Sequence, residues 1–404
     1  MADMQDDAGM AGHAGEVPLV SVIMANHRGA AHLAAAMASV LAQSESRLEL
    51  ILADDASDDD SLAIARELAA ADPRVRVLAA PQNEGPAATR NRAIAAARGT
   101  WLAVVDSDDL IHPDRLARMV AVAEAEGADL VADDLVHFGN GEARTLLQPQ
   151  APLRPEWLTA AALLRSNADP RLPAYGYLKP LIRRATLGAR RYDTALRIGE
   201  DHDLILRLVM AGARFRLLPD PLYAYRRHGG SISHRLSVET VAAMLAAHEA
   251  LPAMPDPEAR AAAEAVGRQL RQTLRYERLV AAIKARRWGA ALPAMADPAM
   301  LARLAGSLRD RRRRAAAQAG KGQGAALPVP AVPPLPAPGG TWATAPAPAA
   351  AAIVAAVRPG NAAAVLPADL PPWARWLAGA VGPEAAPEPV PARPDALAGP
   401  SPAR

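Results

Sequence analysis

The sequence contains no cysteine, which excludes disulfide bonds, thiolate metal sites and cysteine nucleophiles. Lysine is nearly absent as well. It occurs only at Lys179, Lys284 and Lys321, so the basic side chains are almost all arginine. The 45 basic and 43 acidic side chains give a formal net charge of +2. A balance this even gives no support to general nucleic-acid binding.

Long apolar runs are also missing. No stretch approaches the length of a membrane-spanning helix. The first residues, Met1 to Glu16, are acidic and small, and they lack the basic start and apolar run of a signal peptide. We therefore expect a cytoplasmic protein.

From Pro18 to about Ser233 the sequence alternates between short apolar runs and helical stretches. The apolar runs predict buried strands at Leu19–Met24, Leu48–Ala53, Val75–Ala79, Trp101–Val105 and Leu130–Ala132. Helices are expected between them, at Ala31–Ala42, Ser61–Ala71, Pro86–Ala97 and Pro113–Glu126. This alternation predicts an α/β fold with a Rossmann-like, mostly parallel sheet flanked by helices.

The rest of the chain has a different character. A helix is expected at Glu200–Ala211 and a strand at Arg214–Leu218, followed by an alanine-rich helical region from about Val238 to Arg314. After Gly320 the sequence is dominated by proline, alanine and glycine. Such a segment buries too little apolar surface to offset its chain entropy, so we predict a disordered tail.

Acidic clusters follow two of the predicted strands. Asp54 to Asp60 follow the strand ending at Ala53, and Asp106-Ser107-Asp108-Asp109 follow the strand ending at Val105. In a parallel sheet both clusters emerge at the carboxyl edge, where open α/β sheets bind ligands. Carboxylate oxygens suit Mg²⁺ or Mn²⁺, held together with the diphosphate of a substrate.

A structural alternative applies to several of these residues, because aspartate after a strand often caps a helix or forms a turn. That interpretation is favoured for Asp58, Asp59 and Asp60, whereas Asp106 and Asp108 favour a ligand. For Asp54 both remain open. A third cluster, Glu200-Asp201-His202-Asp203, either complements a helix dipole or supplies a general base.

Taken in chain order, several segments resemble the bacterial family-2 glycosyltransferases, which have the GT-A fold. The resemblance covers roughly Val17 to Ser233. It is carried by Val20–Met24, Ser39–Gln43, Leu50–Asp59, Asn83–Asn91, Gly99–Asp109, His112–Leu116, Leu178–Arg184 and Gly199–Leu204.

The resemblance implies a role for each acidic cluster. Asp201 would be the catalytic base, with Glu200 supporting it. Asp108 would ligate the metal directly, while Asp106 would hold the ribose and help bind the metal. Asp54 would contact the base or ribose of the nucleotide. Other candidates are Asp55, Arg90 and His27 for the nucleotide-sugar and His228 for the metal, with Ser231 and Ser233 as weaker ones.

One segment departs from the family pattern. Ala25, Asn26, His27 and Arg28 stand where relatives usually have Pro-Thr-Tyr-Asn. This loop normally lines the nucleotide pocket, so the base contacts of this chain would differ, with His27 able to stack in place of tyrosine.

The resemblance also implies a division of the chain. We expect an N-terminal tail at 1–17 and a nucleotide-sugar-binding half at 18–135. An acceptor-binding and catalytic-base half would follow at 136–237, then a helical extension at 238–316 and the tail at 317–404.

The implied function is that of an inverting, metal-dependent hexosyltransferase. It would move a sugar from a nucleoside-diphosphate sugar, expected to be UDP-linked, to a saccharide or lipid-linked saccharide acceptor in cell-surface or exopolysaccharide synthesis. A lipid-linked acceptor and the Arg309–Arg314 run leave peripheral contact with the membrane surface open. Two alternatives stand beside this function: a non-catalytic nucleotide-sugar-binding scaffold and a sugar nucleotidyltransferase.

Overall fold

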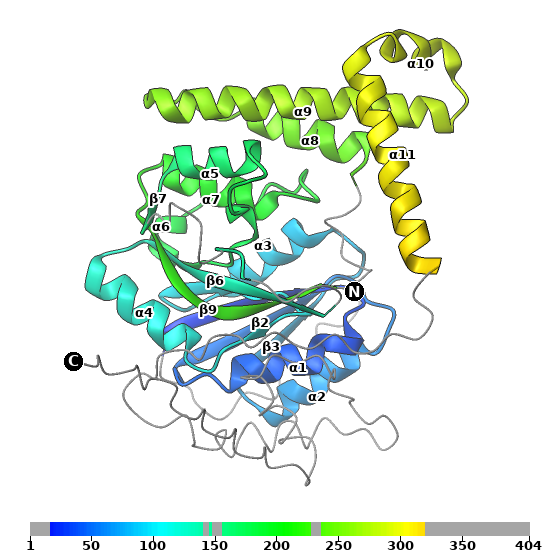
Figure 1. The fold of residues 1–404 in the computed structure, drawn as a ribbon. Helices are drawn as coiled ribbons and strands as arrows, with labels where there is room; N and C mark the ends of the chain where they lie inside the picture. The colour runs from blue at the N-terminus through cyan, green and yellow to red at the C-terminus, as the bar shows by residue number, and fades with distance from the viewer. Residues whose placement is uncertain (1–16, 140–144, 148–155, 228–235, 320–404) are drawn as a thin grey trace, which may run out of the picture.

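The fold is that of a computed structural model, which describes residues 17–139, 145–147, 156–227 and 236–319 (Figure 1). The predicted tails therefore lie outside the described residues, except for Val17 at the start and the end of the last helix. Within the described residues, one mixed sheet forms the centre, with strand order β3-β2-β1-β4-β8-β6-β9-β5.

The first part of the sheet is parallel. Four strands pair side by side in the same direction: β3 (Val75–Ala79), β2 (Leu48–Asp54), β1 (Val20–Asn26) and β4 (Trp101–Val104). β1, β2 and β4 are rich in apolar residues and buried on both faces, as parallel strands with helices on both sides must be, whereas the edge strand β3 is mostly half-buried. Their carboxyl ends therefore meet at one edge.

The second part of the sheet is mixed. β8 (Leu181–Arg183) runs antiparallel between β4 and β6 (Leu130–Gly139), and β6 pairs in parallel with β9 (Phe215–Arg227). Two short strands, β5 (Leu110–Ile111) and β7 (Trp157–Leu158), pair antiparallel with β9. The predicted α/β class is confirmed, and each antiparallel pair of these strands includes β8 or β9.

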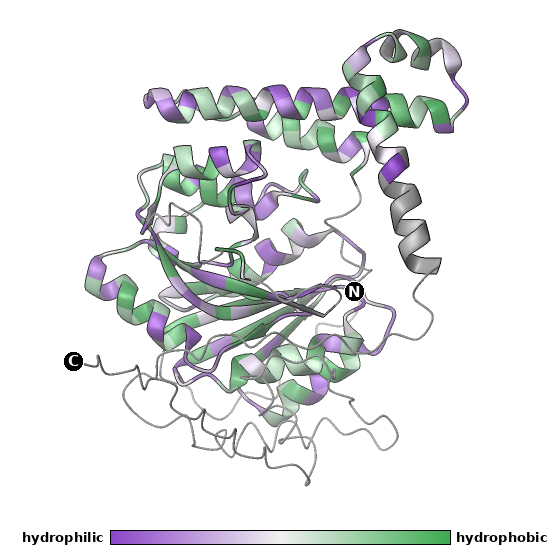
Figure 2. Ribbon diagram, in the orientation of Figure 1, coloured by the Kyte–Doolittle hydropathy of each residue, from purple (hydrophilic) through white to green (hydrophobic). Residues whose placement is uncertain are grey.

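Helices cover both faces of the sheet (Figure 1). On one face α1 (Ala30–Leu41), α2 (Ser61–Ala71) and α4 (Arg115–Glu126) form one apolar cluster with Val20, Val22 and Met24 of β1. On the other face Ile23 joins a second core with α3 (Pro86–Ala96), α5 (Ala160–Ala168) and α7 (Glu200–Met210). The alternation of side chains along β1 therefore fills both cores. Figure 2 shows the resulting hydrophobic colouring along the sheet.

The alanine-rich region folds into four helices in the described part of the chain: α8 (Val238–Glu249), α9 (Pro257–Lys284), α10 (Trp288–Met295) and α11 (Pro298–Ala319). Of these, α9 packs on α5 and places Ala259, Ala262 and Val266 in the second core. No helix within the described ranges is both long and apolar enough to cross a membrane. The division of the chain into halves at residue 135 stays a prediction, since β6 runs through that position.

Candidate active site

A cleft of about 1170 Å³ opens at the carboxyl ends of β1, β2 and β4. The loop after β4 supplies three of its residues, Asp106, Ser107 and Asp108. The start of α7 supplies Glu200 and Asp201 from the opposite part of the sheet. Two acidic clusters almost a hundred residues apart in the sequence therefore line one cavity.

Asp109 is the last residue of the loop after β4, and it does not line the cleft. It is 1% exposed, and its carboxylate accepts hydrogen bonds from the Tyr223 hydroxyl and from the Arg226 backbone N–H, both at 2.7 Å. Burial, and then the nearby charges of Asp108 and Asp106, hold the pKa of Asp109 above its usual range. Asp109 thus anchors the loop to β9, which fixes how Asp106 and Asp108 face the cleft.

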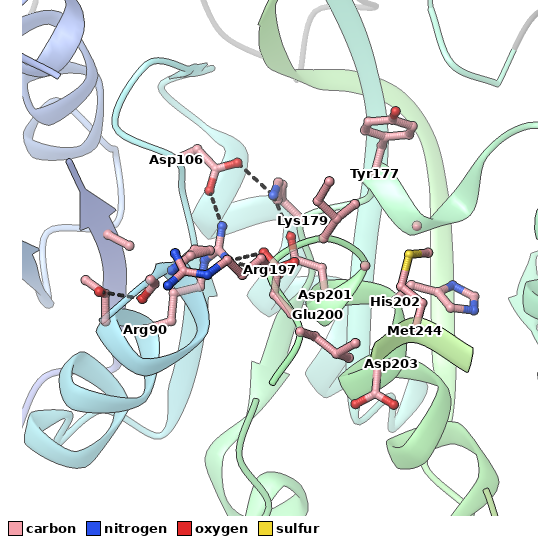
Figure 3. Close-up of a pocket in the computed structure, with 18 of the residues that line it drawn as sticks. Arg90, Asp106, Tyr177, Lys179, Arg197, Glu200, Asp201, His202, Asp203 and Met244 are labelled. Carbon is pink, nitrogen blue, oxygen red and sulfur yellow. Dashed lines mark hydrogen bonds and ion pairs between the residues drawn. The ribbon is translucent and has the colours of Figure 1, made fainter. Parts of the chain in front are cut away.

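A buried ion-pair network joins the two acidic clusters (Figure 3). The Lys179 Nζ lies 2.7 Å from Asp106 Oδ2 and 2.7 Å from Asp201 Oδ2. On the other side, Arg90 donates to Asp106 Oδ1 at 2.9 Å and to Glu200 Oε1 at 2.6 Å. The side chains of Lys179 and Arg90 therefore cross-link three carboxylates at the centre of the cleft.

The network sets the protonation of its acids. Burial raises the pKa of Asp201, but the charges of Arg90 and Lys179 outweigh this effect and leave that pKa below its ordinary value. Burial also raises the pKa of Asp106, but the charges of Lys179 and then Arg90 outweigh this effect and leave that pKa below its ordinary value. Burial and the adjacent Asp201 charge raise the pKa of Glu200. Asp201 is therefore the more readily ionised member of the Glu-Asp pair.

The other network members reach the centre from separate elements. Arg90 comes from α3, and Lys179 follows the short 3₁₀ turn Tyr175–Tyr177. The carbonyl oxygen of Lys179 accepts a hydrogen bond from the guanidinium of Arg115, the first residue of α4. Arg115 is fully buried and forms an ion pair with Asp133 at 2.7 Å. The backbone at Lys179 is therefore held from behind by a second buried pair.

The first acidic cluster divides between two positions. Asp55 lines the cleft, and its carboxylate accepts the backbone N–H groups of Glu84 at 2.7 Å and Gly85 at 2.9 Å. Gly85 has φ +90°, a conformation that glycine adopts without strain, and it leads into α3 with Pro86 at the first turn. Asp55 thus shapes the loop that aims α3 at the cleft.

Asp54 is the exception among the predicted site residues, because the structure does not place it on the cleft wall. It is 1% exposed, and its carboxylate accepts hydrogen bonds from the Asn26 amide at 2.8 Å and from Ser57. This placement does not support the expected contact with the nucleotide, since the carboxylate is already used inside the protein.

The loop that departs from the family pattern lines the cleft with Ala25, Asn26, His27 and Arg28. The Nδ1–H of His27 donates to the Asp55 carbonyl oxygen at 2.9 Å. Arg28 adopts φ +54° and points to Asp58 in an exposed ion pair. Its charge is thus directed to Asp58, while the contact of His27 with a nucleotide stays a prediction.

Most predicted site residues share the cleft: His27, Asp55, Arg90, Asp106, Asp108, Glu200 and Asp201. His228, Ser231 and Ser233 lie outside the described residues. Sequence reasoning missed Lys179, although this residue is one of three lysines and belongs to the segment Leu178–Arg184. It also missed the wall contributed by α8, α9 and the segment between them, which includes Met244, Leu251, Val266 and Leu270.

Comparison with known proteins assigns the family. Residues 21–183 match the model described as Glycosyl transferase family 2. Succinoglycan biosynthesis protein ExoO of Rhizobium meliloti is 38% identical over 58% of this chain and 68% of its own length. Succinoglycan biosynthesis protein ExoU of the same organism is 34% identical over 53% of this chain and 64% of its own length.

A solved structure supports the fold. The crystal structure of S. aureus TarS 1-349 in complex with UDP-GlcNAc is 19% identical, with a TM-score of 0.52 over 68% of this chain and 79% of that one. This likeness confirms the GT-A fold that the sequence predicts. The order of the motifs, the match to the family model and the likeness to ExoO together show that this chain belongs to glycosyl transferase family 2.

Proposed function

We propose that the chain is an inverting, metal-dependent glycosyltransferase. It takes a sugar from a nucleoside-diphosphate sugar, UDP-linked, and passes it to a saccharide or lipid-linked saccharide in exopolysaccharide or cell-surface polysaccharide synthesis. The observation that carries this proposal is that Asp106 and Asp108 share one cleft with Asp201. Support for the pathway comes from ExoO and ExoU, which are named for succinoglycan biosynthesis. UDP-GlcNAc bound by TarS, a protein of the same fold, agrees with the donor class.

The residues of the cleft fit a divalent cation. Asp106 and Asp108 offer carboxylate oxygens from one loop, and the lowered pKa of Asp106 keeps it ionised. Among the described residues there is no cluster of three or more metal-binding side chains. Mg²⁺ and its analogues need only one or two protein carboxylates when substrate phosphates complete the site. When bound by Asp106 and Asp108, the ion supplies Lewis-acid neutralisation of the leaving diphosphate.

The cleft residues divide the reaction between two sides. On the acceptor side, Asp201 takes the proton of the acceptor hydroxyl as that oxygen forms its bond to the anomeric carbon. On the donor side, the bond from that carbon to the phosphate oxygen breaks, and the nucleoside diphosphate leaves with the electron pair. Attack from the face opposite the leaving group inverts the anomeric centre, and no covalent sugar intermediate is needed.

The test is transfer from labelled donors. The purified full chain with Mn²⁺ is incubated with a set of UDP-, GDP- and TDP-sugars, and the release of nucleotide is followed with and without saccharide acceptors. We expect at least slow donor hydrolysis for one donor, acceleration by an acceptor, and a product of opposite anomeric configuration by NMR. A protein that binds a donor but releases no nucleotide would be a scaffold. Pyrophosphate-dependent cleavage of a nucleotide-sugar to a nucleoside triphosphate and a sugar 1-phosphate would instead indicate a nucleotidyltransferase.

The acceptor side has a test of its own. A lipid-linked acceptor would bring the protein to a membrane surface without a spanning segment, which agrees with the helices of the described residues. Flotation with vesicles that carry a polyprenyl-diphosphate saccharide tests this part separately from donor chemistry.

A further inference from the structure

Lys179 is a side chain within hydrogen-bonding distance of both Asp106 and Asp201 in the described cleft. Its Nζ is 2.7 Å from an oxygen of Asp106, on the donor side, and 2.7 Å from an oxygen of Asp201, on the acceptor side. The side chain is 6% exposed. An ammonium group has three donors, so one lysine can hold both carboxylates at once.

Asp201 has no equivalent second partner within the described cleft. The nearest guanidinium nitrogen of Arg90 is 3.8 Å from Asp201 Oδ1, which is too long for a hydrogen bond, and the same nitrogen donates to Glu200 at 2.6 Å. Lys179 is therefore the side chain that fixes the direction of the Asp201 carboxylate.

The position of Lys179 is itself fixed. Its carbonyl oxygen is bound by Arg115, and Arg115 is held by Asp133 in a pair with 0% and 1% exposed side chains. A cation–π contact of 4.9 Å places Arg115 over the ring of Tyr223. Tyr223 in turn donates to Asp109 of the loop after β4. The backbone of Lys179 and the loop carrying Asp106 are thus tied to the same buried group.

We infer that Lys179 is a positioning residue that couples the cation-binding aspartate to the base. It orients Asp201 toward the acceptor hydroxyl, and it competes with the divalent cation for Asp106. This inference rests on the proposed function. Loss of Lys179 should strengthen cation binding, because a competitor for Asp106 is removed. It should also slow transfer, because Asp201 is no longer held in place.

The experiment compares Lys179→Met with wild type and with Lys284→Met, a matched change of an exposed lysine on α9. Mn²⁺ affinity without donor is measured by calorimetry, and kcat and KM are measured for transfer. For Lys179→Met we expect Mn²⁺ to bind about tenfold more tightly, because one unit charge near Asp106 is gone. We expect kcat to fall about 100-fold with donor KM changed less than about threefold, because the base is no longer held in line. Lys284→Met should match wild type in both measurements.

A second variant covers the case in which Lys179→Met does not fold. Lys179→Ala leaves room for an external ammonium group, so methylammonium should restore at least about tenfold of the lost kcat, whereas tetramethylammonium, which has no N–H donor, should restore none. A folded Lys179→Met variant with wild-type Mn²⁺ affinity or wild-type kcat would overturn the inference, as would a Lys179→Ala variant that methylammonium does not rescue. If wild type itself neither transfers sugar nor binds Mn²⁺, the proposed function fails, and this outcome is distinct from a fully active Lys179→Met variant.

Discussion

At the scale of single residues, the site depends on charged side chains that each serve two partners. Arg90 is the clearest case beside Lys179, because its two terminal nitrogens reach Asp106 and Glu200. A planar guanidinium carries donors on separate nitrogens and can bridge two carboxylates. A lysine in its place has one ammonium nitrogen on a shorter side chain.

We predict that Arg90→Lys lowers kcat about 100-fold, because a shift of about 1 Å in a positioned group has that effect. Arg92→Lys, two residues further along the same helix, is the matched control. Arg92 contacts Glu84 and the Asp54 carbonyl oxygen and does not line the cleft. Steady-state transfer assays on both variants decide the matter, and equal losses in the two would contradict the role of Arg90.

Residue roles were predictable where a motif marks them and not where a distant contact defines them. Asp106, Asp108, Glu200 and Asp201 stand in recognisable segments, and the structure brings them to one cleft. For Asp54 and Asp55 the motif is equally clear, but only the hydrogen bonds of Asp54 to Asn26 and Ser57 show that its carboxylate turns inward. Lys179 gave no signal of its role, because both of its carboxylate partners lie far away in the sequence.

At the scale of elements, apolar runs predicted the parallel strands to within two residues. The same signal failed for β6, which was expected at Leu130–Ala132 and extends to Gly139. Two buried aspartates interrupt its apolar run. Asp133 pairs with Arg115, while Asp134 accepts backbone N–H groups of Leu135 and Leu147. Periodicity cannot detect a polar strand residue that is satisfied by a distant partner.

β9 shows the same limit. It was expected at Arg214–Leu218 and runs from Phe215 to Arg227, although Pro219 and Pro221 lie within it. The pairing of β9 with β6 shifts register around Asp134 and Pro221, so the prolines fall at an irregularity of the ladder. This extension matters for the site, because Tyr223 and Arg226 hold Asp109.

The Arg115–Asp133 pair gives an element-scale prediction, since it ties α4 to β6. Replacing one partner leaves a buried charge without compensation, so Arg115→Met and Asp133→Leu should each lower the free energy of unfolding by about 3–5 kcal/mol. The double variant should lose less than either single variant, because it leaves no buried charge. Urea unfolding of the four proteins measures this, and losses that simply add would contradict the coupling.

At the scale of the whole molecule, the first part of α9 belongs to the same core as the sheet, whereas the end of α9 forms a separate apolar cluster with α10 and α11. Val266 of α9 is 7% exposed and lies in one apolar cluster with residues of α5 and α7. The same helix lines the cleft. An alanine-rich helix carries little periodic signal, so the sequence predicted that this region is helical but not that it forms part of the site.

We predict that Val266→Asp destabilises the whole protein by on the order of 4 kcal/mol, because it buries an unpaired charge. Gln272→Asp on the exposed face of α9 should change the stability by less than about 0.5 kcal/mol. Thermal unfolding followed by circular dichroism distinguishes the two. A Val266→Asp protein in which only the C-terminal helices unfold, with the sheet intact, would show that the extension folds separately.

The central claim is that the Asp201 carboxylate on one side of the cleft takes the proton of an acceptor hydroxyl that attacks a donor bound at the other side. The most direct test is a comparison of Asp201→Asn with wild type in donor affinity and in turnover. The account predicts that Asp201→Asn binds the nucleotide-sugar with unchanged affinity in the presence of Mn²⁺, while kcat for transfer falls by about 10²–10⁴-fold. A variant that transfers sugar at nearly the wild-type rate would contradict it.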